Sequence, residues 1–455
     1  MSTTAAVGLI AVFVVDLINL FYISRLGEKE IAAAVGFAGV VGFFHTSVCI
    51  GVTIGITAVV ARAIGAGRRA DARCIATSSL VLMVAVTACV GIVTLMFLHP
   101  LLRALGATGD TERYAARYLA ITVMSMPLLG VGMACAALLR SVGDARRAMM
   151  VTLGAAVATA VLDPILIFGL GMGVEGAATA SVVSRCMLAA VGMRGVVVRH
   201  HLLARFDPGR LRADARLLMG VAGPGVLTNL ATPVGAAFVT HSIAQFGASA
   251  VAGQAIIDRM TPVAFGLVYS LSGAVGPILA QNLGAGQFRR VRVALRASLL
   301  FMVFAVGAAW LLLALGQSLI VWAFSAEGPA AALIHAYCSW IAAGFFFVGA
   351  LFVANAAFNN LGRPLLSTGF NWARATLGTI PFAWIGSHYG PAGVLVGQAA
   401  GAAIFGTLAM VVAFRLAARL GPAQDAGASL DAAPVPEAGS ASALAALMPP
   451  NADDA

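Results

Sequence analysis

The chain has 455 residues, of which 60% are hydrophobic and only 10% are charged, whereas a soluble domain usually carries about 25% charged residues. This composition excludes a water-soluble globular protein. The formal net charge of +10 would suggest a nucleic-acid surface in a soluble protein, but here the arginines cluster in short loops between long apolar runs, so we expect no nucleic-acid partner.

Apolar runs recur along the chain from Ala5 to Arg419, each close to the ~20 residues that a helix needs to cross a bilayer. The first run has neither a basic region nor a cleavage site before it, so we expect it to remain as a helix. In chain order, the sequence predicts spans at Ala5–Ile23, Ile31–Ala61, Ile75–Leu98, Ala115–Leu139, Ala148–Leu170, Val174–Val198, Arg216–Phe246, Ala250–Gln281, Ala294–Phe324, Leu333–Leu361, Leu365–Gly386 and Ala392–Ala418. The predicted fold is an all-α polytopic membrane protein of about twelve transmembrane helices.

The spans divide the chain into domains. We expect an N-terminal six-helix lobe at residues 1–198, a cytoplasmic linker at 199–215 and a C-terminal six-helix lobe at 216–420. Residues 421–455 contain mainly Ala, Pro, Gly, Ser and Asp, and with few large apolar side chains they cannot bury a core. This segment is predicted to be a disordered cytoplasmic tail.

The loop charges predict the orientation of the chain in the membrane. Basic residues concentrate in alternate loops, and the positive-inside rule places those loops in the cytoplasm. They are Arg62, Arg68, Arg69, Arg73, Arg140, Arg146, Arg147, Arg199, Arg205, Arg210, Arg212, Arg289, Arg290, Arg292 and Arg363. Both termini are then cytoplasmic, and the expected location is the inner (plasma) membrane.

The two halves repeat one another. The segment Ala61–Gly67 is echoed 219 residues later by Ala280–Gly286. Nearly the same offset relates Gly27 to Gly247, Gly143 to Gly362 and Gly173 to Gly390. Because each half has an even number of spans, the lobes should share one orientation and be related by a pseudo-two-fold axis along the membrane normal. Two such lobes enclose a central cavity suited to alternating access.

Four segments resemble the multidrug and toxic compound extrusion (MATE) transporters, in the order that this family has them. They are Val15–Gly27, Leu139–Asp144, Leu162–Gly169 and Gln281–Gly286, and the resemblance extends from Val14 to Ala418. Relative to the family, the first helix looks short on its cytoplasmic side. The resemblance implies secondary active antiport, in which organic, often cationic or amphipathic, small molecules leave the cell as protons enter.

Two acidic residues inside predicted spans stand out, because a charged side chain there costs about 2.5–3.5 kcal/mol on insertion scales. Asp16 lies 11 residues before Gly27, and Asp163 lies 10 before Gly173, so both acids are expected at similar depth in the outer half of the membrane. At the repeat offsets their counterparts in the second half are apolar, namely Ala236 and Ile380. This pair therefore belongs to the N-terminal lobe alone.

The resemblance implies that Asp16 and Asp163 carry the coupling ion, with Thr159 and Ser181 as their hydrogen-bond partners. Many family members have asparagines where this chain has Thr159 and Ala136. Fewer amide oxygens favour protons over a sodium cage, although sodium stays possible. No cofactor and no bound metal are expected.

Structural alternatives stay open for these charges. The aspartates could hold helices together, and Arg185, four residues after Ser181, could form a salt bridge with one of them. In the second half, Asp258, Arg259 and Arg374 also lie in spans, where they could line the cavity or pair with each other.

Motifs that are absent from the sequence help to distinguish an antiporter from an ATP-driven transporter, a flippase, an enzyme or a channel. It contains no GxxxxGK[ST] phosphate-binding motif, so ATP is not the expected energy source. A flippase for lipid-linked precursors is the alternative, but it would be expected to have a cavity rich in basic residues. An enzyme would need a catalytic constellation such as paired metal ligands, which the sequence does not show. A channel would not require a carboxylate pair confined to one lobe. We therefore expect a transporter, and we expect it to be a monomer.

Overall fold

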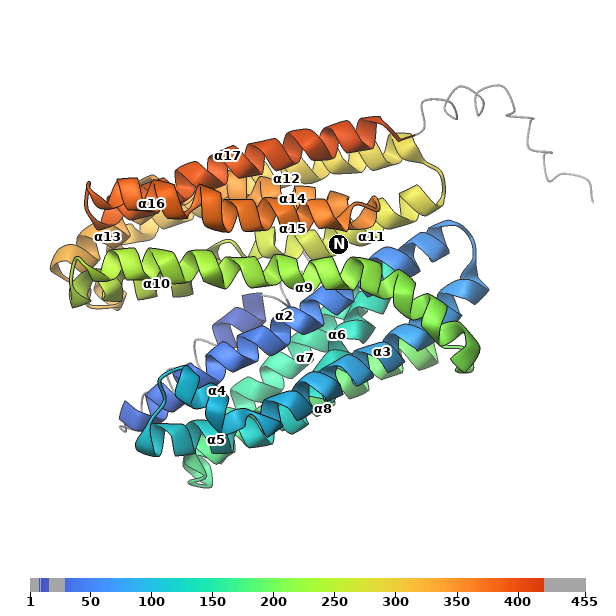
Figure 1. Cartoon of the computed structure of the whole chain (residues 1–455), viewed down its shortest axis with the longest axis horizontal. Helices are drawn as coiled ribbons and strands as arrows, with labels where there is room; N and C mark the ends of the chain where they lie inside the picture. The colour runs from blue at the N-terminus through green and yellow to red at the C-terminus, as the bar shows by residue number, and fades with distance from the viewer. Residues whose placement is uncertain (1–7, 9, 16–28, 421–455) are drawn as a thin grey trace, which may run out of the picture. The chain divides into compact units, whose positions relative to one another are not determined.

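The computed structural model describes residues 8, 10–15 and 29–420, and this part of the chain contains helices but no strands. The helices, labelled in Figure 1, are α2 (Lys29–Gly65), α3 (Arg69–Met96), α4 (Leu98–Ala104), α5 (Gly109–Met124), α6 (Met126–Ser141), α7 (Ala145–Pro164), α8 (Gly173–Arg194), α9 (Pro208–Ala244), α10 (Ala248–Ala264), α11 (Gly266–Gly284), α12 (Phe288–Ala323), α13 (Gly328–Ser339), α14 (Phe345–Asn360), α15 (Pro364–Ala373), α16 (Ile380–Ser387) and α17 (Pro391–Ala418). Short π-helical or 3₁₀ turns, η1 to η4, cover Ile165–Gly169, Gly195–Arg199, Ile341–Gly344 and Arg374–Gly378.

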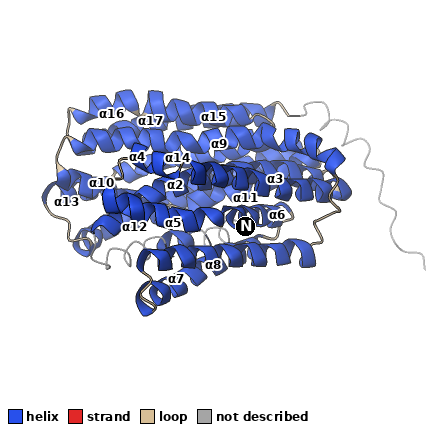
Figure 2. Cartoon of the chain, turned by 60° about the horizontal axis from the view of Figure 1, so that its bottom comes forward, coloured by secondary structure: helices blue, strands red, loops and turns tan. Residues whose placement is uncertain are grey.

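The described helices agree with a protein that crosses a membrane many times. Eight are long and apolar enough to span by themselves, and two bent pairs raise the number to 10. Figure 2 shows that short loops join these helices. Most of the first predicted span, and the predicted tail, lie outside the described residues.

Proline explains where two of the spans bend. The axis turns by 49° between α5 and α6, where Pro127 follows the break at Ser125. It turns by 50° between α10 and α11, just after Pro262. A proline has no N–H to donate and clashes with the preceding turn, so the backbone hydrogen bonds are interrupted there. At the first bend, the carbonyl of Thr122 accepts from the backbone N–H of Ser125 at 3.2 Å and from the Ser125 hydroxyl at 2.8 Å.

The helices up to Ala418 form one compact unit in which the halves of the chain lie on two sides. Figure 1 shows α3 to α8 gathered on one side and α11 to α17 on the other. Between them α2 crosses α9 at Gly51, which packs against Gly225 and Val226. The helices come this close because Gly51 has no side chain; a Cβ there would collide with the backbone of α9. From this crossing the two helices diverge toward the left of Figure 1.

The sequence repeat is also a repeat of backbone conformation. Gly67 and Gly286 have φ of 74° and 70°, and Gly143 and Gly362 have φ of 87° and 84°. These left-handed values favour glycine because it has no Cβ. At each turn the following residue donates its backbone N–H five residues back, as in a helix-terminating Schellman motif. These four turns mark one end of the unit, which we call the arginine-rich end.

The inter-lobe connection is shorter than the predicted linker 199–215. Helix α9 begins at Pro208, because Asp207 caps it by accepting from the backbone N–H of Gly209 and the fixed φ of proline suits the first helical position. The first turns of α9 are then held against α3. Arg210 donates to Asp71 at 3.1 Å, and Ser78 donates to the buried carboxylate of Asp214 at 2.7 Å.

Candidate functional site

Asp163 lies at the end of α7 and only 1% of its surface is exposed. Pro164 follows it directly, and the chain then continues as the π-helical turn Ile165–Gly169. Irregular turns of this kind are frequent at functional sites. Asp16, its predicted partner, lies outside the described residues, so the pairing of the two acids stays a prediction.

Thr159 and Ser181 do not make the expected hydrogen bonds with Asp163, and those expected with Asp16 lie outside the described residues. Each donates its hydroxyl to the carbonyl four residues earlier in its own helix, at 3.1 Å, rather than to Asp163. The bond between α7 and α8 comes instead from Ser184, which donates to the carbonyl of Ala155 at 2.8 Å. Sequence spacing placed Ser181 at a suitable depth, but helix rotation decides which hydroxyl faces the neighbouring helix.

Of the two salt bridges left open for Arg185, the one with Asp163 is not formed, and Asp16 lies outside the described residues. Its guanidinium reaches the bend between α5 and α6, where it donates to the carbonyl of Thr122 and, at 2.8 Å, to the hydroxyl of Ser125. Thr122 and Ser125 are both buried, and the side chain of Arg185 on α8 supplies a donor for them there. Arg185 thus connects α8 to the kinked span.

In the second half, Asp258 lies on α10 and accepts a hydrogen bond from Gln254 at 2.8 Å. It forms no ion pair with Arg259 or Arg374 within the described residues, so the alternative in which these charges pair is wrong. Arg259 is exposed, whereas the Nε of Arg374 is buried.

Aromatic rings gather around Tyr269 of α11. Phe265 stacks on Phe345 with ring centroids 4.1 Å apart. Tyr269 lies 5.8 Å from Phe345 and 5.2 Å from Phe352, and it also contacts Phe13 from the first helix at 6.1 Å. These rings pack against one another and connect α11 to α14 and to the first helix.

At the arginine-rich end, two hydrogen bonds join the lobes in a symmetric manner. Arg62 of α2 donates from Nη2 to the carbonyl of Asn360 at 2.7 Å, and Gln281 of α11 donates to the carbonyl of Ser141. The repeat offset of 219 relates Arg62 to Gln281 and Ser141 to Asn360. The lobes are therefore closed against each other at this end by one contact made twice.

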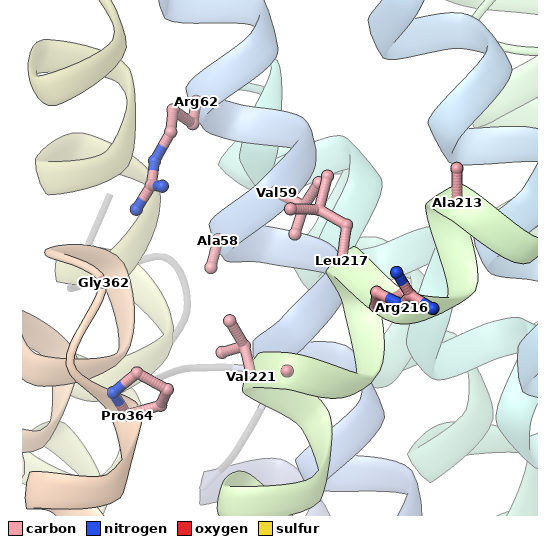
Figure 3. A pocket seen from close by; sticks show the side chains of 10 residues that line it. Ala58, Val59, Arg62, Ala213, Arg216, Leu217, Val221, Gly362 and Pro364 are labelled. Atoms are coloured by element: carbon pink, nitrogen blue, oxygen red, sulfur yellow. The ribbon is translucent and has the colours of Figure 1, made fainter.

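A cavity of about 460 Å³ remains beside this contact, between α2, α9 and the turn that precedes α15. Figure 3 shows Arg62 and Arg216 on its walls, with apolar side chains between them. None of the residues that line it is acidic; they are Ala58, Val59, Arg62, Ala213, Arg216, Leu217, Gly220, Val221, Gly362 and Pro364.

Comparison with known proteins identifies the family. The MatE family model matches residues 5–165 and again residues 224–385, two segments that start 219 residues apart. The chain belongs to the MATE family of transporters. The second match begins at the offset found in the sequence, so the repeat is a property of the family fold and the predicted resemblance is confirmed.

Relatives and solved structures agree with this family. The MATE chain is 31% identical over 396 residues to a FAD transporter of Shewanella oneidensis, covering 85% of this chain and 87% of that protein. It is 24% identical over 389 residues to the probable multidrug resistance protein YoeA of Bacillus subtilis, covering 82% and 83%. A structure of the Vibrio cholerae MATE transporter VcmN matches with a TM-score of 0.88 and 23% identity, covering 93% of this chain and 96% of that one.

These comparisons confirm the predicted fold class. MATE structures have 12 helices in two lobes. Beyond the 10 spans counted above, α15, η4 and α16 lie in the predicted span Leu365–Gly386, and most of the first predicted span lies outside the described residues. The chain is thus a multi-pass membrane protein with the fold of transporters. The cytoplasmic location of its termini stays a prediction.

Proposed function

We propose that this protein is a secondary active antiporter that exports organic compounds in exchange for protons. The observation that carries the proposal is Asp163, a carboxylate buried inside a span of a MATE-family transporter, whose counterpart in the other lobe is Ile380. An ionisable group in a membrane span is expensive and marks an ion pathway by default. Sodium is the alternative coupling ion.

Alternating access provides the mechanism. In the conformation described here the lobes are joined at the arginine-rich end, while α2 and α9 diverge toward the other end (Figure 1). Protonation of Asp163 from outside would favour substrate release and return of the lobes. Deprotonation on the cytoplasmic side would then allow substrate to bind again.

Two substrate classes are compatible with the relatives. The names of several relatives, such as YoeA, refer to multidrug resistance, which suggests organic cations or amphipathic drugs. The relative at 31% identity is a FAD transporter, which suggests an anionic flavin dinucleotide. The aromatic cluster around Tyr269 would suit the planar ring systems of either class.

Asp163→Asn tests the proposal, because asparagine keeps the size of the side chain but cannot titrate near neutral pH. We expect the variant to insert and to bind substrate, yet to lose export driven by a pH gradient in proteoliposomes. Ethidium and FAD serve as fluorescent probes of the two substrate classes, and a protonophore should abolish wild-type export.

The matched control is Asp258→Asn, which removes a carboxylate from a span of the other lobe and should reduce export much less. Wild-type export rates in Asp163→Asn would show that Asp163 is structural. Wild-type export that survives the protonophore but stops without sodium would replace protons by sodium in the mechanism.

A further inference from the structure

The two hydrogen bonds that close the arginine-rich end are equivalent in geometry but not in charge. Arg62 makes one of them and its repeat counterpart Gln281 makes the other. Arg140, one residue before Ser141, likewise corresponds to the neutral Asn359. Positive charge at this contact therefore belongs to the N-terminal lobe alone, and the closing contact itself does not require it, because Gln281 forms the same bond without charge.

Neither arginine has a carboxylate partner. Arg62 and Arg140 are partly buried, and the Nε of each is enclosed without a hydrogen-bond acceptor. Neither forms an ion pair within the described part of the chain. A guanidinium removed from water without a compensating charge destabilises the state that holds it. Exposed arginines at the same end, such as Arg146, already provide the charge that orients the chain, so orientation does not account for this pair.

Both guanidiniums lie against the opposite lobe, Arg140 beside α11 and Arg62 at the end of α14. The Nε of Arg140 is 3.9 Å from the position that a Cβ on Gly273 would occupy, and a Cβ on Gly276, three residues further along α11, would lie 3.0 Å from the side-chain amide nitrogen of Asn360. Arg62 donates to the carbonyl of that asparagine. Separation of the lobes at this end would consequently uncover both arginines together.

We propose that Arg62 and Arg140 form an anion-binding pair that holds the phosphate or carboxylate group of an anionic substrate when the lobes are open at the arginine-rich end. A guanidinium binds such groups through two parallel hydrogen bonds, which an ammonium or amide cannot reproduce. On closure, the carbonyl of Asn360 replaces the substrate as the acceptor for Arg62. The cavity between Arg62 and Arg216, which has no acidic lining residue, is open space next to Arg62 in the closed state (Figure 3).

This inference rests on the alternating-access function proposed above and adds the charge of the substrate to it. The test replaces each arginine by the residue at the equivalent position of the other lobe, as Arg62→Gln and Arg140→Asn, singly and together. Gln at position 62 keeps an amide that can form the closing hydrogen bond, as Gln281 does, and both changes remove the positive charge. Arg146→Gln is the control, because it removes the same charge from an exposed position at the same end.

Binding is measured in nanodiscs by the fluorescence of flavin mononucleotide and riboflavin, which share a ring system and differ by one phosphate, with pyrophosphate as a competitor. We expect the wild type and Arg146→Gln to bind flavin mononucleotide more tightly than riboflavin. The double variant should lose roughly tenfold or more of the affinity for flavin mononucleotide, the size of a charged hydrogen bond. Its affinity for riboflavin should change by less than about twofold.

Equal wild-type affinity for the two flavins, or an unchanged preference in the double variant, would overturn the proposal. If the double variant does not fold, the single variants Arg62→Gln and Arg140→Asn are compared instead, with Arg62→Lys as a variant that keeps the charge. The single variants should lose affinity for flavin mononucleotide but not for riboflavin. Failure of the antiport function is recognised separately, since a wild type that binds flavin mononucleotide through these arginines but shows no proton-dependent export would leave the binding pair in place.

Discussion

At the scale of single residues, the turn between α6 and α7 is held by a carboxylate. Asp144 caps α7 by accepting from the backbone N–H of Arg147 at 3.0 Å, and it also accepts from Nε2 of His200 at 2.8 Å. Burial alone would raise the pKa of this carboxyl, but the hydrogen bonds from His200 and Arg147 outweigh it and lower the pKa to about 2. Asp144 thereby connects the start of α7 to the residues that follow α8.

The lowered pKa of Asp144 makes its contribution to stability dependent on pH. Because the folded value lies below the ordinary value of 3.8, the contribution is complete above about pH 4 and is lost as pH falls toward 2. Asp144→Asn keeps the helix cap but removes the charge. We expect it to lower the unfolding free energy by up to about 2 kcal/mol at pH 7, measured by thermal unfolding in detergent. A difference from the wild type that stayed constant down to pH 2 would contradict this origin.

At the scale of elements, the turns at Gly67 and Gly286 allow the cost of backbone strain to be measured without a change in side-chain packing. Gly67 and Gly286 both have positive φ, and an added Cβ at either would meet nothing within 4 Å. A substitution there is penalised only by the left-handed backbone, which costs an L-residue about 1–2 kcal/mol. The two turns should therefore respond equally, although their lobes differ in sequence.

Gly67→Ala and Gly286→Ala are expected to lower stability by similar amounts, each about 1–2 kcal/mol, without changing transport. Thermal unfolding in detergent gives the first quantity and proteoliposome export the second. Effects that differed widely between the two turns would show that the turns, though equal in φ, are constrained by different surroundings.

At the scale of the whole molecule, closure of the lobes depends on the absence of two side chains. A Cβ on Gly65 would collide with the carbonyl of Gln281, and one on Gly284 would collide with the carbonyl of Arg62. These glycines are again related by the offset of 219. The close approach of α2 and α11 is therefore possible only with glycine on both helices.

Gly65→Ala should hold the lobes apart at the arginine-rich end. The measurement is the distance between spin labels at Arg146 and Arg290, which are exposed at this end on opposite lobes. We expect a shift of the population toward longer distances and slower export. Gly67→Ala, two residues away, strains the turn without touching α11 and should leave the distances unchanged. An unaltered distribution in Gly65→Ala would mean that the lobes tolerate the added methyl group when closed.

Sequence alone predicted the elements and their repetition, because both depend on local properties. Apolar length predicts a span, and a glycine that ends a helix repeats wherever the same turn is needed. The cost of a carboxylate in a span also singled out Asp163 before its burial was known. The predicted linker 199–215 was too long, since the cap at Asp207 starts α9 at Pro208.

Tertiary structure decided which side chains meet. Arg185 reaches the bend at Ser125 instead of Asp163, and Ser184 rather than Ser181 joins α7 to α8. A side chain's partner depends on the rotation and crossing of helices that are distant in sequence, and neither is encoded in local spacing. From loop charge alone, Arg62 is predicted only to orient the chain in the membrane, because its contacts with the other lobe cannot be read from local sequence. The repeat shows that Arg62 is charged where its counterpart Gln281 is neutral. Only the tertiary structure shows that both side chains form the hydrogen bonds that join the lobes.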